Sequence, residues 1–245
     1  MKKKSVSAVE NELADCDVSH KRIFSTLNTE ELELFDKTKV CLFFRKGQSV
    51  FNEGSYPLGL YCLDAGKVKL EHSGDEGKMQ IVRMKKGGDL LGYRSLFCGE
   101  KYNASAVAIE DTNLFFIPKD TVFEVLKINH RLSMDMLRLL AHDLRAAENH
   151  LTELAQKPVR ERLAKALLYL KETYGLEDDQ STINVQLSRE EIADLVGTAT
   201  ETAIRLLSEF RQEGIIELIG KKISIADKSK LIATAHYYQP EMVLY

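Results

Sequence analysis

The chain has 245 residues, of which 44% are hydrophobic and 29% charged, and its formal net charge is −3. This is the composition of a globular protein with one large domain or two ordinary ones. It excludes a globally basic surface, so any contact with nucleic acid must depend on local charge. No stretch reaches the roughly 18 apolar residues of a membrane span.

The first residues and the cysteine pattern predict a cytoplasmic protein. The basic cluster at 2–4 is not followed by an apolar run, so residues 1–20 are expected to form a solvated tail and not a signal peptide. The cysteines have no CxxC or Cys/His ligand spacing, which argues against a disulfide framework and a metal site. They are Cys16, Cys41, Cys62 and Cys98.

Residues 21–125 are expected to form an antiparallel β-sandwich or barrel. Over about 40–116, short runs rich in Val, Ile, Phe and Tyr are separated by glycines, and apolar and polar residues alternate at 67–70 and 79–84. Many short strands with glycine turns at this spacing are typical of such folds. The stretch SGDEG, at 73–77, predicts the tip of a hairpin.

The hydrophobic period then changes to that of a long helix, expected over 126–157 and ended by Pro158. Apolar residues recur at alternating steps of three and four, which is the seam of a left-handed coiled coil and predicts self-dimerisation. A helix packed on its own domain is the alternative. Such a helix usually has a wider apolar stripe than the one left here by charged neighbours such as Arg138 and Asp143. The seam consists of Leu137, Leu140, Leu144, Ala147, Leu151 and Leu154.

Residues 158–230 are expected to form a winged helix-turn-helix. Two short amphipathic helices are separated by a tight glycine turn and followed by a β-hairpin, and this arrangement places the second helix in the DNA major groove. Short motifs mark the helix starts and the turns. They are two capping-box spacings, Ser188 with Glu191 and Thr198 with Glu201, the turn at Gly197, and the hairpin turn at Gly220-Lys221.

The second helix should have a core side and a free side. At 100° per residue, Ala203, Leu206, Leu207 and Phe210 form one stripe, and Glu201, Arg205, Ser208 and Gln212 fall opposite it. An arginine can donate two hydrogen bonds to guanine and a glutamate can accept one from cytosine, so Glu201 and Arg205 can face bases. The alternative is a surface ion pair, which is the commoner role for a Glu and an Arg at this spacing. The helix-turn-helix context favours DNA.

Two parts of the chain carry a family resemblance. The stretch LSREEIADLVGTATETAIRLLSEFRQEGIIELIGKKISI closely resembles the DNA-binding end of the Crp/Fnr family of bacterial transcription regulators. FRKGQSVFNEGSYPLGLYCLDAGKVKL, followed by GGDLLGYRSLF, is similar to the effector-sensing β-roll of that family. The resemblance implies an α+β fold with a β-roll over 21–125, a dimerisation helix over 126–157 and a winged helix-turn-helix over 158–230. The extension over 231–245 lies outside the family pattern.

The resemblance implies a homodimer that binds an inverted repeat in double-stranded DNA, with RNA polymerase as a further partner. The glutamate and arginine with which family members read bases correspond to Glu201 and Arg205. Ile204, just before the arginine, either contacts a thymine methyl or packs against the wing. Ser188, Arg189, Lys221 and Lys222 suit phosphate contacts. The expected DNA-binding residues are Ser188, Arg189, Thr198, Thr200, Glu201, Ile204, Arg205, Ser208, Lys221 and Lys222.

The expected effector site departs from the cyclic-nucleotide pattern of the family. Members that bind cyclic nucleotides have a glutamate for the ribose after the GD-x-x-G loop and, ten residues on, an arginine for the phosphate. Tyr93 and Asn103 stand at these positions, and Ala104 replaces the usual serine or threonine. Cyclic AMP is therefore not expected as the effector. The candidate effector-site residues are Gly92, Tyr93, Arg94, Asn103 and Ala104.

The sequence gives little support for the other effectors of the family, such as an iron–sulfur cluster or haem. An iron–sulfur cluster needs several clustered N-terminal cysteines, and only Cys16 lies near the start. Cys98 is a redox-responsive thiol if it is exposed, but a small apolar residue beneath the loop is the expected role. Haem ligation stays open, without a supporting spacing, for four histidines: His72, His130, His142 and His150.

An enzyme is not expected, because the sequence has no Ser/His/Asp set, metal-ligand cluster or P-loop. The alternative to a regulator is a ligand-binding or scaffold protein that keeps the β-roll and uses its helical end for protein contacts. Steep salt dependence of binding would distinguish a DNA-binding protein from this alternative.

Overall fold

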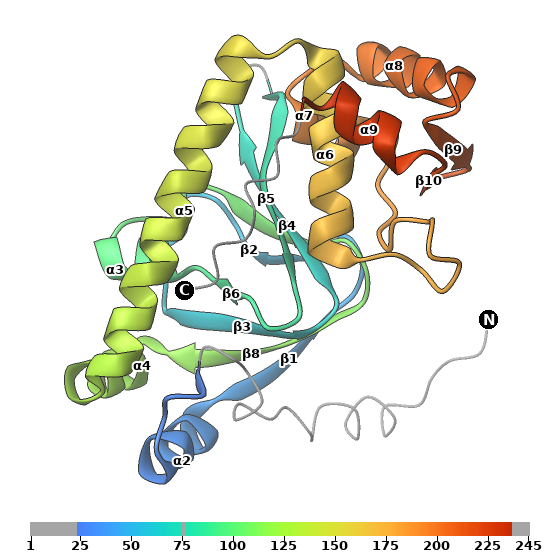
Figure 1. Cartoon of the computed structure of the whole chain (residues 1–245). Coiled ribbons are helices and arrows are strands. Elements are labelled where there is room, and N and C mark those ends of the chain that lie inside the picture. The colour runs from blue at the N-terminus through green and yellow to red at the C-terminus, as the bar shows by residue number, and fades with distance from the viewer. Residues whose placement is uncertain (1–23, 75–76, 237–245) are drawn as a thin grey trace. The chain divides into compact units, whose positions relative to one another are not determined.

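The computed structural model describes residues 24–74 and 77–236 (Figure 1). The chain divides into two compact units, Met1–Lys78 with Val82–Arg145, and Met79–Ile81 with Ala146–Tyr245. Strands dominate the first unit and helices the second, which confirms the predicted α+β class. None of the described helices is long and apolar enough to cross a membrane.

Two four-stranded sheets form the β-roll of the first unit. Their strand orders are β1-β8-β3-β6 and β2-β7-β4-β5, and every pair with a described register is antiparallel. This confirms the predicted antiparallel sandwich or barrel. The strands are β1 (Val40–Phe44), β2 (Ser49–Phe51), β3 (Gly59–Ala65), β4 (Lys67–Ser73), β5 (Met79–Lys86), β6 (Leu90–Leu91), β7 (Ser105–Ala108) and β8 (Thr112–Pro118).

Consecutive strand residues supply two different hydrophobic clusters, because side chains alternate across a sheet. On β8, Leu114 packs inside the roll with Leu63 of β3. The next residue, Phe115, packs on the outer face of the same sheet with Phe35. The outer cluster is covered by the helices α2 (Thr29–Thr38), α3 (Tyr93–Cys98), α4 (Lys119–Ile128) and the start of α5 (His130–Gln156).

The long helix α5 begins later than the sequence predicted. A helix was expected from residue 126, but residues 126–128 belong to α4, which ends at Ile128 and has Asn129 as its C-cap. The backbone N–H of Asn129 donates to the carbonyl of Val125 at 2.8 Å, which closes α4. Its side-chain oxygen accepts from the N–H of Leu132 at 2.8 Å, which starts α5 in the manner of an N-cap. One asparagine therefore separates two helices without a glycine or proline.

The second unit consists of helices and a short hairpin, as predicted. Figure 1 shows α9 beside α6, and the two helices are in contact. The domain end expected at residue 230 falls inside α9, whose Leu231 is fully buried. The elements are α6 (Val159–Tyr174), α7 (Arg189–Val196), α8 (Thr200–Gln212), β9 (Ile216–Ile219), β10 (Lys222–Ile225) and α9 (Lys228–Thr234).

One of the two predicted capping boxes is formed and the other is not. Ser188 and Glu191 make the reciprocal pair, with N–O distances of 2.8 and 3.0 Å. The box predicted for Thr198 and Glu201 is wrong, because Ala199 is the N-cap of α8 and its side chain makes no cap hydrogen bond. The N–H of Thr198 instead donates to the carbonyl of Ala193 at 3.0 Å. Thr198 thus completes the end of α7.

Candidate nucleic-acid interface

The second helix of the helix-turn-helix, α8, buries one face and leaves the other in solvent. Arg205 keeps 63% of its side chain exposed, Ile204 is 48% exposed, and Glu201 and Ser208 are exposed as well. This exposure favours a contact outside the domain for Ile204 over packing against the wing. The buried face is the predicted one: Ala203, Leu206, Leu207 and Phe210.

The ion pair on this exposed face is not the Glu201–Arg205 pair that the sequence analysis gave as the alternative to base contacts. Nη1 of Arg205 donates to Oε1 of Glu209 at 2.5 Å, one helical turn towards the C-terminus. Among the described residues, the pairing of Arg205 with Glu201 is not formed. Glu201 is therefore not tied to the arginine, and Glu209 is a candidate site residue that the sequence analysis missed. Its spacing of four residues from Arg205 was the available signal.

Arg189 holds the turn of the wing. Its Nη2 donates to the carbonyl oxygen of Gly220 at 3.0 Å, and burial lowers the pKa of its guanidinium. Its Nη1 is buried and has no hydrogen-bond partner in the part of the chain that the structure describes. A buried donor without an acceptor is costly, and a nitrogen closed to solvent cannot reach a phosphate unless the side chain rearranges. Ser188, next to it, already uses its hydroxyl in the capping box.

The remaining predicted contacts surround α8 and the wing. Lys221 is exposed at the hairpin turn, whereas Lys222 pairs with Glu177 at 2.6 Å. Thr198 and Thr200 are half-buried just before and at the start of α8. The structure therefore brings the predicted DNA-binding residues onto the helix-turn-helix and the wing of one unit. Of the two lysines, Lys221 is exposed, whereas the charge of Lys222 is already paired within the chain.

The position of the helix-turn-helix within its unit depends on Arg162, a residue that the sequence analysis did not select. On one side its Nε donates to the carbonyl of Val196 at 3.1 Å, and its Nη2 to the carbonyl of Gly197 at 3.0 Å. On the other side its Nη1 lies 3.3 Å from the carbonyl of Leu154 and 3.1 Å from that of Lys157. One guanidinium thus joins the turn before α8 to the end of α5.

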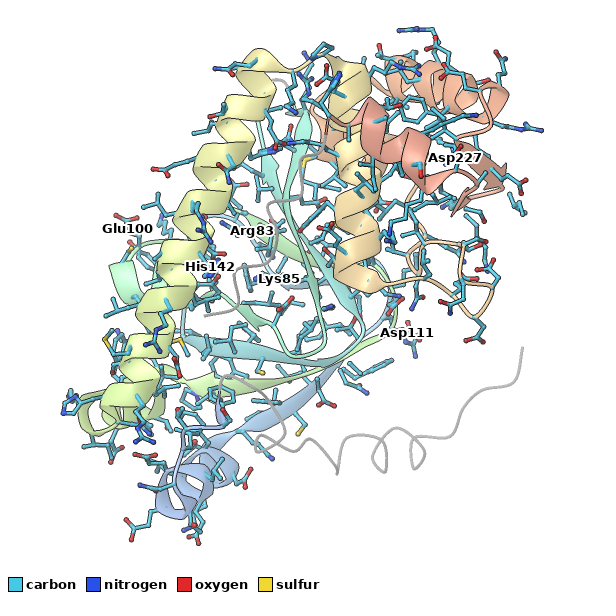
Figure 2. All side chains as sticks on the ribbon, in the orientation of Figure 1. Arg83, Lys85, Glu100, Asp111, His142 and Asp227 are labelled. Atoms are coloured by element: carbon cyan, nitrogen blue, oxygen red, sulfur yellow. The ribbon has the colours of Figure 1, made fainter. Side chains whose placement is uncertain are left out.

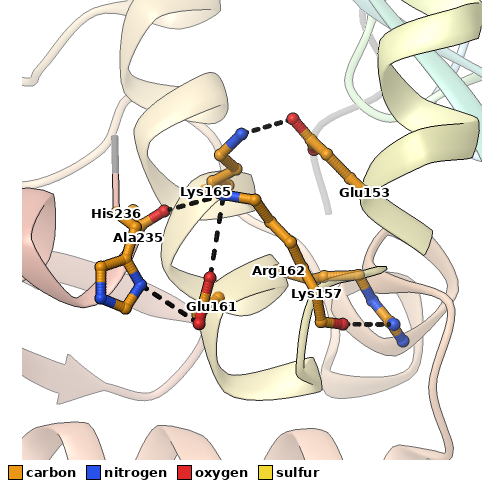
Figure 3. A network of polar contacts seen from close by, with 7 residues as sticks. All are labelled: Glu153, Lys157, Glu161, Arg162, Lys165, Ala235 and His236. Carbon is orange, nitrogen blue, oxygen red and sulfur yellow. Dashed lines mark hydrogen bonds and ion pairs between the residues drawn. The ribbon is translucent and has the colours of Figure 1, made fainter. Parts of the chain in front are cut away.

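Further polar contacts surround the same junction (Figure 3). Lys165 of α6 pairs with Glu153 of α5 at 2.5 Å. Nζ of Lys157, between α5 and α6, lies 3.4 Å from the carbonyl oxygen of Ala235 at the end of α9. His236 contacts Glu161 at 3.1 Å. The start of α6 is therefore held from both the α5 side and the α9 side.

The predicted coiled-coil seam is divided between two faces of α5. Leu137, Leu144 and Leu151, each seven residues apart, are 57%, 62% and 66% exposed. Leu140 instead packs on the outer hydrophobic cluster of the roll, and Leu154 is half-buried. The remaining seam residue is exposed: Ala147. An apolar row with heptad spacing thus remains in solvent.

In the candidate effector site, Tyr93 is directed to a partner within the protein. Its hydroxyl donates to Oδ2 of Asp143 on α5. Nη1 of Arg83 on β5 donates to Oδ1 of the same carboxylate at 2.5 Å, and Nη2 donates to the Asp143 carbonyl at 3.0 Å; the Arg83 side chain lies beside α5 (Figure 2). Burial and the hydrogen bond to Asp143 raise the pKa of Tyr93. Asp143, which the sequence suggested was a solvated neighbour of the seam, is buried.

The other effector-site candidates surround the start of α3. Gly92 has a φ of +81°, and a Cβ there would lie 3.1 Å from the ring of Tyr102. This places Gly92 against the residue that precedes Asn103. Arg94 and Asn103 are exposed and Ala104 is buried. No charged side chain stands at the Tyr93 or Asn103 position.

The cysteine and histidine predictions have mixed outcomes. Cys98 is exposed, so the expectation of a buried position beneath the loop is wrong. Its place at the end of α3, before the left-handed Gly99, turns it towards solvent. His72 pairs with Glu53 at 2.7 Å. Within residues 24–74 and 77–236, no group of three or more His, Cys, Asp and Glu side chains has a metal-binding arrangement.

The fold and this surface define a DNA-binding transcription regulator with a β-roll and a winged helix-turn-helix. Two family models match the chain: the cyclic nucleotide-binding domain over residues 41–129 and the Crp-like helix-turn-helix domain over residues 161–234. The chain belongs to the Crp/Fnr family of transcription regulators and is not an enzyme.

Similar proteins from other bacteria support this assignment. The chain is 29% identical over 214 residues to the CRP-like cAMP-activated global transcriptional regulator of Mycobacterium tuberculosis, covering 87% of this chain and 96% of that protein. It is 27% identical over 223 residues to the fumarate and nitrate reduction regulatory protein of Escherichia coli, covering 90% and 89%.

Solved structures agree with the fold. FixK2 from Bradyrhizobium japonicum has a TM-score of 0.72 at 25% identity, covering 80% of this chain and 97% of that one. A Crp/Fnr-family regulator from Thermus thermophilus has a TM-score of 0.69 at 27% identity, covering 81% and 99%.

Replacing Tyr93 by Phe removes the hydroxyl that donates to the buried Asp143 carboxylate. Because hydrogen bonds to charged groups contribute about 1.5–3 kcal/mol, we expect the free energy of unfolding to fall by that amount. Urea unfolding followed by circular dichroism measures it. The control is Tyr102→Phe, since Tyr102 is equally buried but its hydroxyl has no partner among the described residues. Equal losses in the two variants would contradict the prediction.

Replacing Arg162 by Lys keeps the positive charge but loses the planar fork that reaches acceptors on both sides. We expect the variant to lose about 2–4 kcal/mol of stability, because several carbonyls lose their donor. Calorimetric melting of both proteins measures the change. Arg138→Lys is the control, because Arg138 makes an exposed pair with Asp135, its only ion pair among the described residues, and should shift stability by less than about 0.5 kcal/mol. A wild-type melting curve for Arg162→Lys would exclude the role given to this side chain.

Proposed function

We propose that the protein acts as a homodimer that binds an inverted-repeat operator and regulates transcription under the control of an effector other than cyclic AMP. The observation that carries the proposal is the exposed face of α8, where Glu201, Ile204 and Arg205 lie together in solvent on a helix whose other face is buried. A DNA partner would place the protein in the cytoplasm.

The exposed residues of α8 have the chemistry of base readout. Arg205 can donate two hydrogen bonds to the O6 and N7 atoms of guanine, Glu201 can accept from cytosine N4, and Ile204 can pack on a thymine methyl. Arg189 and Lys221, near the wing turn, supply candidate phosphate contacts. Thr198, Thr200 and Ser208 lie beside them and suit backbone or water-mediated contacts.

The exposed apolar row on α5 supports the homodimer. Leu137, Leu144 and Leu151 repeat every seven residues, which is the period of a helix that packs along a second copy of itself. A two-fold dimer presents two α8 helices to one face of DNA, so its half-sites should lie about 34–36 Å apart. RNA polymerase is the proposed further partner of the DNA-bound dimer.

The effector proposal follows from the side chains around α3. The Mycobacterium tuberculosis relative is named as cAMP-activated, but this chain has no carboxylate at Tyr93 and no guanidinium at Asn103 to hold a ribose and a cyclic phosphate. The Tyr93 hydroxyl is already committed to Asp143. We therefore propose an effector of different chemistry.

Selection from a pool of random-sequence duplexes tests the proposal, with and without a small-molecule extract of the expressing cells so that a missing effector does not hide binding. We expect an enriched inverted repeat. For Arg205→Ala, we expect a loss of about 1–3 kcal/mol in discrimination at one base pair of each half-site. Arg211→Ala is the matched control, because it removes the same charge from α8 and should weaken all duplexes alike. A pool without any enriched repeat under both conditions would contradict the proposal.

The homodimer is tested by placing a charge on the exposed row of α5. Leu144→Asp should convert the dimer into monomers, because a buried unpaired carboxylate opposes packing of the two helices. Native mass spectrometry measures the stoichiometry. Ile128→Asp is the control, since Ile128 is 64% exposed on α4 and lies outside the row. A dimer that survives Leu144→Asp would place the self-contact elsewhere.

A further inference from the structure

Glu209 places a second carboxylate on the exposed face of α8, in addition to that of Glu201. Specific protein–DNA interfaces are strongly positive, yet residues 158–236 contain fewer Lys and Arg than Asp and Glu. Glu201 has a proposed role in base readout. Glu209, in the next part of the same face, has none, and its carboxylate would oppose the approach of phosphates.

Glu209 is the centre of a chain of four charges. Its Oε1 accepts from Arg205 at 2.5 Å, and its Oε2 lies 3.5 Å from Nη1 of Arg160 on α6. Nη2 of Arg160 pairs with Glu213 at 2.6 Å, and the Arg160 guanidinium lies 4.8 Å from the ring centre of the buried Phe210. The four charges thus run from Arg205 on the exposed face of α8, through Glu209 and Arg160 in the first turn of α6, to Glu213 at the end of α8.

The two arginines of this chain of charges differ in freedom. Arg160 is held by two carboxylates and an aromatic ring and is 34% exposed, so it fixes the position of the Glu209 carboxylate. Arg205 is 63% exposed and has Glu209 as its ion-pair partner among the described residues. The side chain that can leave the pair is therefore Arg205. While it is paired, its guanidinium is drawn towards the C-terminal part of α8 and away from Glu201.

We propose that Glu209 is a specificity-determining residue that competes with DNA for Arg205; the inference rests on the proposed DNA-binding function. An exposed ion pair changes an equilibrium by about two- to five-fold. A bidentate contact with guanine discriminates by roughly five- to 150-fold and outcompetes the pair. A contact with a single backbone phosphate is too weak to outcompete the Arg205–Glu209 pair. Glu209 therefore lowers binding to unrelated DNA more than binding to the operator, which is specificity by opposition to the wrong partner.

Glu209→Gln tests this in the full-length protein, because glutamine keeps the size and removes the charge. Fluorescence anisotropy measures binding to two labelled duplexes of equal length, one carrying the selected operator and one lacking it, over a series of salt concentrations. We expect affinity for the unrelated duplex to rise by about two- to five-fold for each bound protomer. Its salt slope should steepen by about 0.9 for each, since Arg205 now neutralises a phosphate. Affinity for the operator should change less, so the ratio of the two falls.

Glu213→Gln is the matched control. It removes the same charge from the same end of the domain and the same kind of contact with Arg160, but Glu213 lies a turn away and does not pair with Arg205. A smaller effect than that of Glu209→Gln supports the proposal, as does loss of the Glu209→Gln effect in an Arg205→Gln background. Equal effects of Glu209→Gln and Glu213→Gln would show that only the overall charge matters, and this would overturn the proposal.

Two other outcomes are also decisive. If Glu209→Gln weakens the operator and leaves unrelated DNA unchanged, Glu209 orients Arg205 for reading, and the competition is overturned. If the wild-type protein binds neither duplex at any salt concentration, with or without the cell extract, the proposed DNA-binding function itself fails, and the inference fails with it.

Discussion

The guanidinium of Arg162 satisfies carbonyl oxygens at two helix ends at once. The last carbonyls of a helix have no partner inside that helix, and here those of Leu154 and Val196 belong to α5 and α7. Only a planar group with several donors can reach both sides with good geometry, which is why an arginine serves where a lysine would not. The turn that precedes α8 is therefore fixed to the end of α5 by hydrogen bonds.

This constraint carries through to the exposed face of α8. Gly197 accepts one of the Arg162 bonds while adopting a φ of +72°, which allows the chain to turn sharply between α7 and α8. From that turn, the buried stripe that ends at Phe210 sets the rotation of α8 about its axis. Arg205 is exposed because Arg162 fixes the turn before α8 and because the opposite face of the helix is buried in the core. The face of α8 and its anchor are parts of one arrangement.

Much of this could be predicted from the sequence, because the signals are local. The capping box at Ser188, the glycine at 197 and the apolar period of α8 each depend on residues within one or two turns. The predictions that failed depend on competition between partners. Thr198 had the right spacing for a cap but closed α7 instead, and Arg205 had two glutamates at a distance of four residues and paired with the C-terminal one.

Contacts between distant parts of the chain could not be predicted in the same way. Asp143 looked like a solvated neighbour of the seam, and nothing within a few turns of it reveals that Tyr93 and Arg83 approach it from α3 and β5. Periodicity alone also could not decide which leucines of α5 stay exposed. Which leucines stay exposed depends on which face of α5 packs on the β-roll, and only the tertiary structure shows this face.

The face of α5 that packs on the β-roll determines which of its leucines stay exposed. Leu132, Met136 and Asp143 are buried on the side that meets the roll, and Leu140 follows the same side. Leu144 lies 100° further round the helix than Asp143, which places it outside the buried stripe. Leu144 therefore buries little of its side chain within its own chain and contributes little to its folding. Leu137 and Leu151 share its exposure and its seven-residue spacing, which is the pattern expected of the helix–helix surface that we propose.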